Sequence, residues 1–112
     1  MSAVNFDLNN LTIIVDRNHF QLDGPTDDVM KMDNMEEKIK AFGFAVDVVD
    51  GHDCKSLTEV LTKTYDIPNV IIADTIKAHG ISFLENNKMS HQCSLTQKQY
   101  EQAKQELEDV EI

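Results

Sequence analysis

The sequence predicts an α/β fold, a three-layer Rossmann-like partial domain built on a parallel sheet. Three short runs rich in β-branched residues, 11–15, 44–49 and 70–73, alternate with stretches of helical periodicity. Such alternation is typical of βαβ units with right-handed crossovers. In open sheets of this kind ligands bind at the carboxyl ends of the strands, and the first run ends in the polar residues 16–19. We therefore expect a binding site at that end.

The composition narrows the class of partner. The 112 residues are enough for one domain at most, and 20 acidic against 10 basic residues give a formal charge of −10. Nucleic-acid binding is not expected, because it needs clustered Lys and Arg, and a phosphate ligand would need amides and a metal. No apolar run approaches the roughly 18 residues of a membrane span, and no signal-peptide pattern opens the sequence. We expect no membrane association and a cytoplasmic location.

The first strand is predicted over 11–15, too short for a helix and apolar enough to be buried on both faces. Before it, residues 1–10 show no period and are interpreted as the end of a helix. After it, Asp23-Gly24-Pro25 predicts a turn, since Pro25 lacks an N–H donor. The two cysteines, Cys54 and Cys93, lie far apart without CxxC spacing, which favours reduced thiols over a disulfide or a metal pair.

The first main helix is predicted to begin at a capping box formed by Asp33 and Glu36 and to end at Gly43. Its buried face is expected to consist of Met35, Ile39 and Phe42. The strand over 44–49 follows.

Asp53 is a plausible N-cap for a second helix through about Tyr65, with a buried stripe of Leu57, Val60 and Leu61. The third strand, 70–73, follows the break at Pro68.

The remainder of the chain is predicted to be a loop over Gly80 to Gln92 and then one more helix. Thr96 and Gln99 form its capping pair, and the helix is expected to run to about residue 107. Its inward residues are expected to be Tyr100, Ala103 and Leu107.

Oxygen donors gather after the first strand. Asp16, Asn18 and the backbone around Phe20 suit a hard cation such as Mg²⁺. Asp and Asn after a strand are also common turn formers, which is the alternative interpretation. Four histidines fall in predicted loops at spacings that match no zinc pattern, which favours surface hydrogen-bonding roles for them: His19, His52, His79 and His91.

Five linked motifs occur in the order and spacing of a transketolase. They are Asn-Leu-Thr-Ile-Ile-Val-Asp-Arg-Asn-His-Phe-Gln-Leu-Asp-Gly (10–24), Ala-Phe-Gly-Phe (41–44), Val-Asp-Gly-His-Asp (49–53), Thr-Ile-Lys-Ala-His-Gly (75–80) with Ser-Phe-Leu-Glu-Asn-Asn (82–87), and Ser-His (90–91). Over about residues 3 to 107 the chain resembles the second half of the thiamine-diphosphate-binding N-terminal domain of transketolases. The version it resembles most is the separate N-terminal chain of split bacterial transketolases.

The resemblance implies a cofactor, a metal and a reaction. The cofactor is thiamine diphosphate, held through Mg²⁺ or Ca²⁺, and the reaction is transfer of a two-carbon ketol unit between sugar phosphates. The resemblance implies that the Asn18 side chain and the Phe20 carbonyl are metal ligands. It also implies that Leu22 packs against the thiamine rings. It places His91 near the diphosphate and the substrate as a hydrogen-bond donor or catalytic proton shuttle, with Lys77 and His79 on the adjacent cofactor-binding loop.

The sequence also departs from the family pattern. No Gly-Asp-Gly occurs, so the aspartate ligand of the metal is expected from outside these residues, as is the acidic residue that activates the cofactor. Ala78 and Gln92 stand where the family usually has glycine. We therefore expect catalysis only with partners, a transketolase C-terminal chain or other thiamine-enzyme subunits, in a homo- or hetero-oligomer. The alternatives are a degenerate non-catalytic module with an assembly or regulatory role, and a small anion-binding α/β module.

Overall fold

The computed structural model describes residues 1–21 and 24–108. Contacts within the chain divide it into two compact units. Unit 1 consists of Met1–Arg17 and Met32–Thr75, and unit 2 consists of Asn18–Lys31 and Ile76–Ile112. Each predicted strand falls in unit 1.

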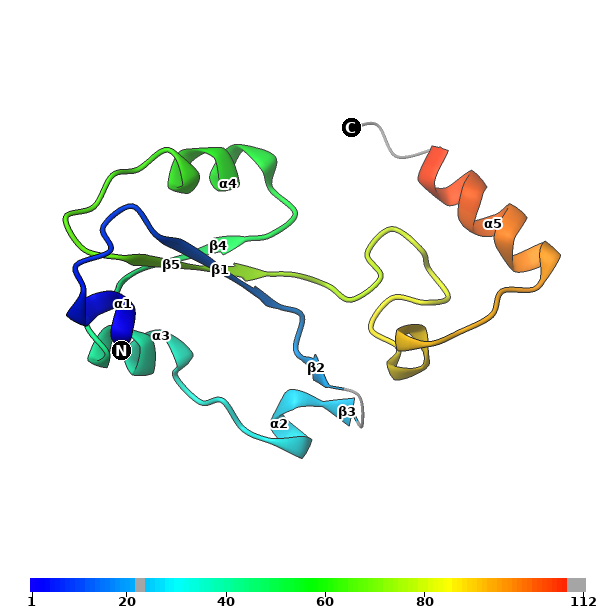
Figure 1. The fold of residues 1–112 in the computed structure, drawn as a ribbon. Helices are drawn as coiled ribbons and strands as arrows, with labels where there is room; N and C mark the ends of the chain where they lie inside the picture. The colour runs from blue at the N-terminus through cyan, green and yellow to red at the C-terminus, as the bar shows by residue number, and fades with distance from the viewer. Residues whose placement is uncertain (22–23, 109–112) are drawn as a thin grey trace. The chain divides into compact units, whose positions relative to one another are not determined.

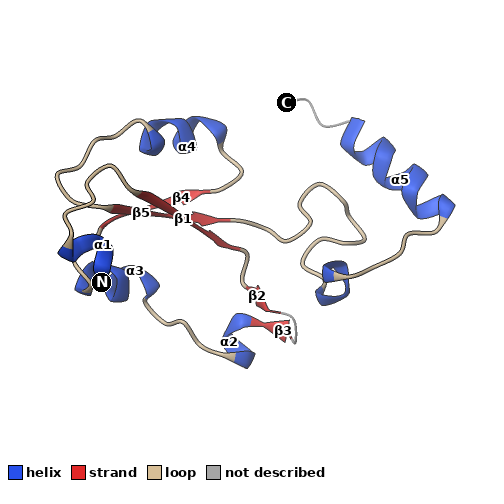
Figure 2. Ribbon diagram, viewed as in Figure 1, coloured by secondary structure: helices blue, strands red, loops and turns tan. Residues whose placement is uncertain are grey.

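Unit 1 is a parallel α/β sheet with helices on both faces. Its strands are β1 (Thr12–Arg17), β4 (Ala45–Asp50) and β5 (Asn69–Asp74), in the order β1-β5-β4 and all parallel. Figures 1 and 2 show α4 (Cys54–Leu61) on one face and α1 (Ser2–Asn5) with α3 (Met35–Ala41) on the other. This arrangement confirms the predicted three-layer α/β architecture.

Strand β5 forms the centre of unit 1. Its apolar residues Val70, Ile71, Ile72 and Ala73 are all buried, and Ile71 and Ile72 have no exposed surface. A continuous apolar run is what a strand covered on both faces requires, so the prediction for this segment is confirmed. The register places the ends of all three strands side by side, with Asp74 opposite Arg17 on one neighbour and Asp50 on the other.

Strand β1 is less buried than predicted. Ile14 is 56% exposed, and Ile13 is also exposed. The physical reason is position, because β1 lies at the edge of the sheet and, within the described residues, pairs with β5 alone. The expectation that this strand is buried on both faces is therefore wrong for the described chain.

Helix α3 begins one residue later than predicted. Asn34, not Asp33, is its N-cap, and the Asn34 side chain accepts a hydrogen bond from the Glu37 amide at 3.4 Å. Glu36 pairs with Lys40 one turn on, so it does not complete a capping box. The predicted stop at Gly43 is confirmed, since its φ of 91° is left-handed and its amide donates to the Lys40 carbonyl at 2.8 Å.

The Asp53 cap of α4 is confirmed, because its carboxylate accepts from the Lys55 amide at 2.9 Å and the Ser56 hydroxyl at 2.5 Å. The helix ends at Leu61, earlier than the predicted Tyr65. Leu61 is exposed, unlike the buried Val60. Phe42, just past the end of α3, is exposed as well. Both residues lie at the C-terminal end of a helix.

Tyr65 instead contributes to a polar cluster on β4. Its hydroxyl donates to the carboxylate of Asp47, and Lys63 donates to the same carboxylate at 2.7 Å. Burial alone would raise the pKa of Asp47, but the hydrogen bonds from Lys63 and Tyr65 outweigh it and hold the pKa below its usual value. Asp47 is therefore ionised in the folded chain at pH values where an ordinary aspartate is protonated.

This cluster predicts an acid-sensitive contribution to stability. Because the pKa of Asp47 is lower in the folded than in the unfolded chain, its contribution is present above the unfolded value of about 3.9 and is lost as pH falls through the folded value. In the unaltered chain we expect the midpoint of urea unfolding to fall as the pH is lowered below about 5, and in Asp47→Asn we expect it to fall less steeply. The exposed Asp66, as Asp66→Asn, is the control, and an unchanged slope in Asp47→Asn would contradict the account.

Unit 2 contains short elements and one longer helix. A two-stranded antiparallel ribbon joins β2 (Phe20–Gln21) to β3 (Gly24–Pro25), and α2 (Thr26–Val29) follows. The segment predicted as loop ends in a 3₁₀-helix, Lys88–His91, and the longest helix is α5 (Gln97–Glu108). No helix in the described part of the chain is long and apolar enough to cross a membrane.

Helix α5 begins as predicted. The Thr96 hydroxyl accepts from the Gln99 amide at 3.3 Å, and the Gln99 side chain accepts from the Thr96 amide at 3.0 Å, which is a capping box. Ala103 is buried, but Tyr100 and Leu107 are more than half exposed, so the predicted inward face is correct only at Ala103. Glu106 of α5 accepts two hydrogen bonds from Ser82 of the loop before the helix, so part of the face toward that loop is polar.

Both cysteines, Cys54 and Cys93, are free and exposed.

Candidate functional site

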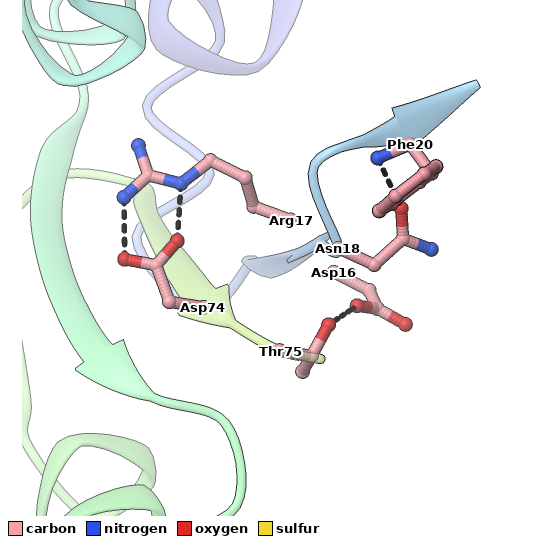
Figure 3. Close-up of polar contacts among 6 residues, drawn as sticks. All are labelled: Asp16, Arg17, Asn18, Phe20, Asp74 and Thr75. Atoms are coloured by element: carbon pink, nitrogen blue, oxygen red, sulfur yellow. Dashed lines mark hydrogen bonds and ion pairs between the residues drawn. The ribbon is translucent and has the colours of Figure 1, made fainter. Parts of the chain in front are cut away.

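The carboxyl ends of β1 and β5 are joined by side chains. Arg17 makes a two-pronged ion pair with Asp74, the residue opposite it in the register (Figure 3). Its hydrogen bond with Asp74 raises the pKa of Arg17. The Thr75 hydroxyl donates to the carboxylate of Asp16, also drawn in Figure 3. Asp16 and Arg17 therefore link the carboxyl end of β1 to that of β5 within unit 1.

The first predicted metal ligand, Asn18, shapes the turn that follows β1 in the sequence. Its side-chain oxygen Oδ1 accepts a hydrogen bond from the Phe20 amide at 3.0 Å, as Figure 3 shows. Between them His19 adopts a left-handed φ of 61°, and its carbonyl accepts from the Thr26 amide at 2.8 Å. An Asn that bonds to the backbone two residues on forms a local turn, so the turn-forming interpretation of Asn18 is correct. That role leaves the second lone pair of Oδ1 available.

The second predicted ligand, the Phe20 carbonyl, is directed away from the ribbon. Phe20 lies opposite Pro25, and the preceding pair, His19 and Thr26, is hydrogen-bonded. Hydrogen-bonded and non-bonded pairs alternate in an antiparallel ladder, so the Phe20 N–H and C=O both point outward from β3. Pro25 has no N–H to donate in any case. The Phe20 carbonyl and the Asn18 Oδ1 that its amide contacts therefore lie on the same edge.

Lys77 contacts this turn. Its ammonium nitrogen Nζ lies 5.9 Å from the centroid of the Phe20 ring, a cation–π distance. The Lys77 carbonyl accepts from the Asn86 amide at 3.0 Å, which closes the loop between these two residues. Within the loop, Ala78 has a left-handed φ of 56°, a conformation that favours glycine, so the departure from the family pattern at this position is accommodated with backbone strain.

The structure brings some predicted site residues together and separates others. Asn18, Phe20 and Lys77 form one contact group. His79, on the same loop as Lys77, pairs its Nδ1 with the Glu85 carboxylate at 2.8 Å. His91 is exposed at the end of the 3₁₀-helix, and among the described residues no hydrogen bond or ion pair joins it to Asn18 or Lys77.

Leu22, predicted to pack against the cofactor rings, lies outside the described residues.

The two oxygen donors at the turn could fill only part of a metal ion's coordination shell. Asn18 Oδ1 and the Phe20 carbonyl are neutral oxygens, the type that Mg²⁺ and Ca²⁺ accept. Within residues 1–21 and 24–108 there is no group of three or more His, Cys, Asp or Glu that would hold a metal ion. Two neutral oxygens fit a metal site whose anionic ligands come from a cofactor phosphate and from an acidic residue outside this turn.

Sequence reasoning missed one part of unit 2, the contact between α5 and the loop that bears Lys77. Glu106 accepts hydrogen bonds from the Ser82 amide at 2.7 Å and the Ser82 hydroxyl at 2.6 Å. Ser82 opens one of the motifs described above, but Glu106 belongs to none of them, and the two residues are far apart in the sequence. Only the folded chain reveals the pair.

The parallel sheet of unit 1 defines an α/β protein, a class in which ligands bind at the carboxyl ends of the strands. Comparison with known proteins specifies the family. The family model described as the transketolase, thiamine diphosphate binding domain matches residues 1–109. The chain belongs to this transketolase family, as its motifs predict.

Three similar proteins have transketolase names. An apulose-4-phosphate transketolase subunit of Actinobacillus succinogenes is 36% identical over 111 residues, covering 97% of this chain and 40% of that protein. The 6-deoxy-6-sulfo-D-fructose transketolase subunit SqwG of a Clostridium species is 35% identical over 104 residues, covering 90% and 38%. The crystal structure of transketolase from Campylobacter jejuni superimposes with a TM-score of 0.85 at 29% identity, covering 93% of this chain and 17% of that one.

The chain thus spans 38–40% of the length of these two curated subunits. It corresponds to a part of each of them.

Proposed function

We propose that this chain forms the part of a transketolase thiamine diphosphate site that anchors the diphosphate and its Mg²⁺ or Ca²⁺ ion. The observation that supports this most is the turn after β1, where Asn18 Oδ1 and the Phe20 carbonyl lie on one edge of unit 2. The match of residues 1–109 to a thiamine diphosphate binding domain supports a cofactor at this turn. In this proposal residues 1–112 are a partial thiamine-diphosphate-binding domain.

A metal is needed at such a site for an electrostatic reason. The chain has a formal charge of −10, which would repel a diphosphate. A divalent ion held by Asn18 and Phe20 would offset this repulsion. Lys77, whose ammonium lies over the Phe20 ring, adds a positive charge beside these two residues. Thiamine diphosphate, when bound, supplies the carbanion-stabilising chemistry for transferring a two-carbon ketol unit between sugar phosphates.

The remaining predicted residues have proposed roles at the same cofactor. Leu22 would give the thiamine rings an apolar contact. The Glu85 carboxylate pairs with Nδ1 of His79 and so fixes the orientation of that imidazole ring. In this orientation His79 would donate a hydrogen bond to a phosphate oxygen. His91, exposed on its 3₁₀-helix, would reach the substrate side and hold or transfer a proton at its imidazole.

The proposed activity depends on partners. The two curated proteins described above are named as subunits of transketolases, which supports a second chain for this protein as well. We propose that residues outside 1–112 supply the Gly-Asp-Gly aspartate and that a partner chain supplies the residue that activates the cofactor, in a homo- or hetero-oligomer located in the cytoplasm. The pentose phosphate pathway is one setting for such a transferase.

Titration of thiamine diphosphate with Mg²⁺ tests the proposal. We expect saturable binding, measured by isothermal titration calorimetry, when the chain is combined with a transketolase C-terminal chain and a chain bearing Gly-Asp-Gly. Omitting Mg²⁺ should weaken it, since the metal links the diphosphate to Asn18 and Phe20. Binding that is unaffected by adding this chain would favour the alternative, a non-catalytic assembly or regulatory module.

A further inference from the structure

The loop that bears Lys77 is held at several points. The hydrogen bond from the Asn86 amide to the Lys77 carbonyl closes it, and the Ile81 amide donates to the Ala78 carbonyl at 3.3 Å. Three of its residues, Ala78, Gly80 and Asn86, have left-handed φ values of 56°, 88° and 51°. A loop with left-handed residues needs outside contacts to keep one conformation.

Glu106 on α5 supplies such a contact. One carboxylate oxygen, Oε2, accepts from the Ser82 amide, and the other, Oε1, accepts from the Ser82 hydroxyl and from Gln102 at 2.7 Å. These hydrogen bonds from Ser82 and Gln102 lower the pKa of Glu106, so the carboxylate is charged near neutral pH. Three donors therefore converge on one side chain, which is an arrangement that only a carboxylate satisfies completely.

Apolar packing accompanies the polar contact. The methyl carbon Cδ2 of Leu107 approaches to within 3.3 Å of where a Cβ on Gly80 would lie. The loop thus lies against α5 through adjacent residues of that helix. Its other end reaches Phe20 through the Lys77 ammonium.

We propose that Glu106 is a positioning residue for the cofactor site, which fixes the Ser82 loop against α5 so that Lys77 stays over Phe20. This inference rests on the proposed function, because Phe20 and Asn18 are there the metal ligands. Glu106 itself does not touch the cofactor. It acts through Ser82 and the loop backbone, and the left-handed residues make the loop dependent on it.

Glu106→Gln is the informative variant because it keeps the size of the side chain. A glutamine has one acceptor oxygen, and its NH₂ group cannot accept from the Ser82 amide or Gln102. One donor is then left unsatisfied, and the loop loses its anchor while the packing of Leu107 is retained. The matched control is Glu108→Gln on the same helix, whose carboxylate pairs with Lys104 at 3.5 Å and not with the loop.

A spectroscopic readout distinguishes positioning from a general effect on α5. Because the Lys77 ammonium lies over the Phe20 ring, we expect the ring current to shift the NMR resonance of the Lys77 ε-methylene upfield in the unaltered chain. In Glu106→Gln we expect this ring-current shift to disappear and hydrogen exchange of the Ser82 and Asn86 amides to rise about tenfold. Thiamine diphosphate affinity, measured with Mg²⁺ and the partner chains, should fall about tenfold, in the range seen for lost supporting contacts at metal sites.

The outcomes separate this inference from the function on which it rests. An unchanged Lys77 resonance and unchanged amide exchange in Glu106→Gln would overturn it. Unchanged thiamine diphosphate affinity in Glu106→Gln, with reduced affinity in Asn18→Ala, would also overturn it while leaving the proposed function standing. If neither variant lowers the affinity, the proposed function fails and the positioning role fails with it.

Discussion

Replacing Ile71 by alanine is expected to destabilise the chain by about 2 to 5 kcal/mol, the range for truncating a fully buried aliphatic side chain. Ile71 has no exposed surface, and its strand, β5, is bonded to β1 on one side and to β4 on the other. The truncation leaves a cavity against both neighbours. The midpoint of urea unfolding, followed by circular dichroism, measures the loss.

Ile14→Ala is the matched control. Ile14 lies directly opposite Ile71 in the register, but it is 56% exposed at the sheet edge. The same deletion of atoms should there cost less than about 1 kcal/mol, because most of the removed surface already faces solvent. Equal losses in the two variants would contradict the placement of β5 at the centre of the sheet.

Gly51→Ala is expected to cost about 1 to 3 kcal/mol through overpacking. A Cβ at Gly51 would lie 2.4 Å from the Thr75 methyl carbon and 3.0 Å from the Asp74 carbonyl oxygen. The Gly51 amide also donates to that carbonyl at 2.7 Å, so the backbone cannot withdraw without losing the bond. Thr75 would have to move, together with its hydrogen bond to Asp16.

A second substitution tests that explanation. Thr75→Ser removes the methyl carbon but keeps the hydroxyl that donates to Asp16. The double variant should therefore recover part of the unfolding free energy lost in Gly51→Ala, a coupling expected of residues in contact. Simple addition of the two single effects in urea unfolding would show that the steric account of Gly51 is wrong.

The sequence predicts the parallel core well because its signals are local. The run 70–73 is continuously apolar, and the caps at Asp53 and Thr96 use side chains that bond within their own first turn. Burial of β1 and the inward face of α5 are predicted poorly. Both depend on which elements lie alongside, and neither the edge position of β1 nor the polar surroundings of α5 is visible in periodicity.

The candidate site likewise has a part that the sequence predicts and a part that it does not. The resemblance to transketolases names Asn18 and Phe20, and the chemistry of the turn alone gives oxygen donors suited to a hard cation. The contact of Lys77 with Phe20 and that of Glu106 with Ser82 join segments far apart in the chain. Such contacts are set by tertiary packing, so no spacing rule anticipates them.

Retention of thiamine diphosphate by Asn18→Ala tests the central claim most directly. The measurement is the dissociation constant for thiamine diphosphate with Mg²⁺ in the presence of the partner chains, compared with Asn9→Ala, a substitution at an exposed asparagine of unit 1. We predict that Asn18→Ala weakens binding at least about tenfold, since a side-chain ligand is lost, while Asn9→Ala binds as the unaltered chain does. Equal affinity in the two variants would contradict the assignment of Asn18 as a metal ligand.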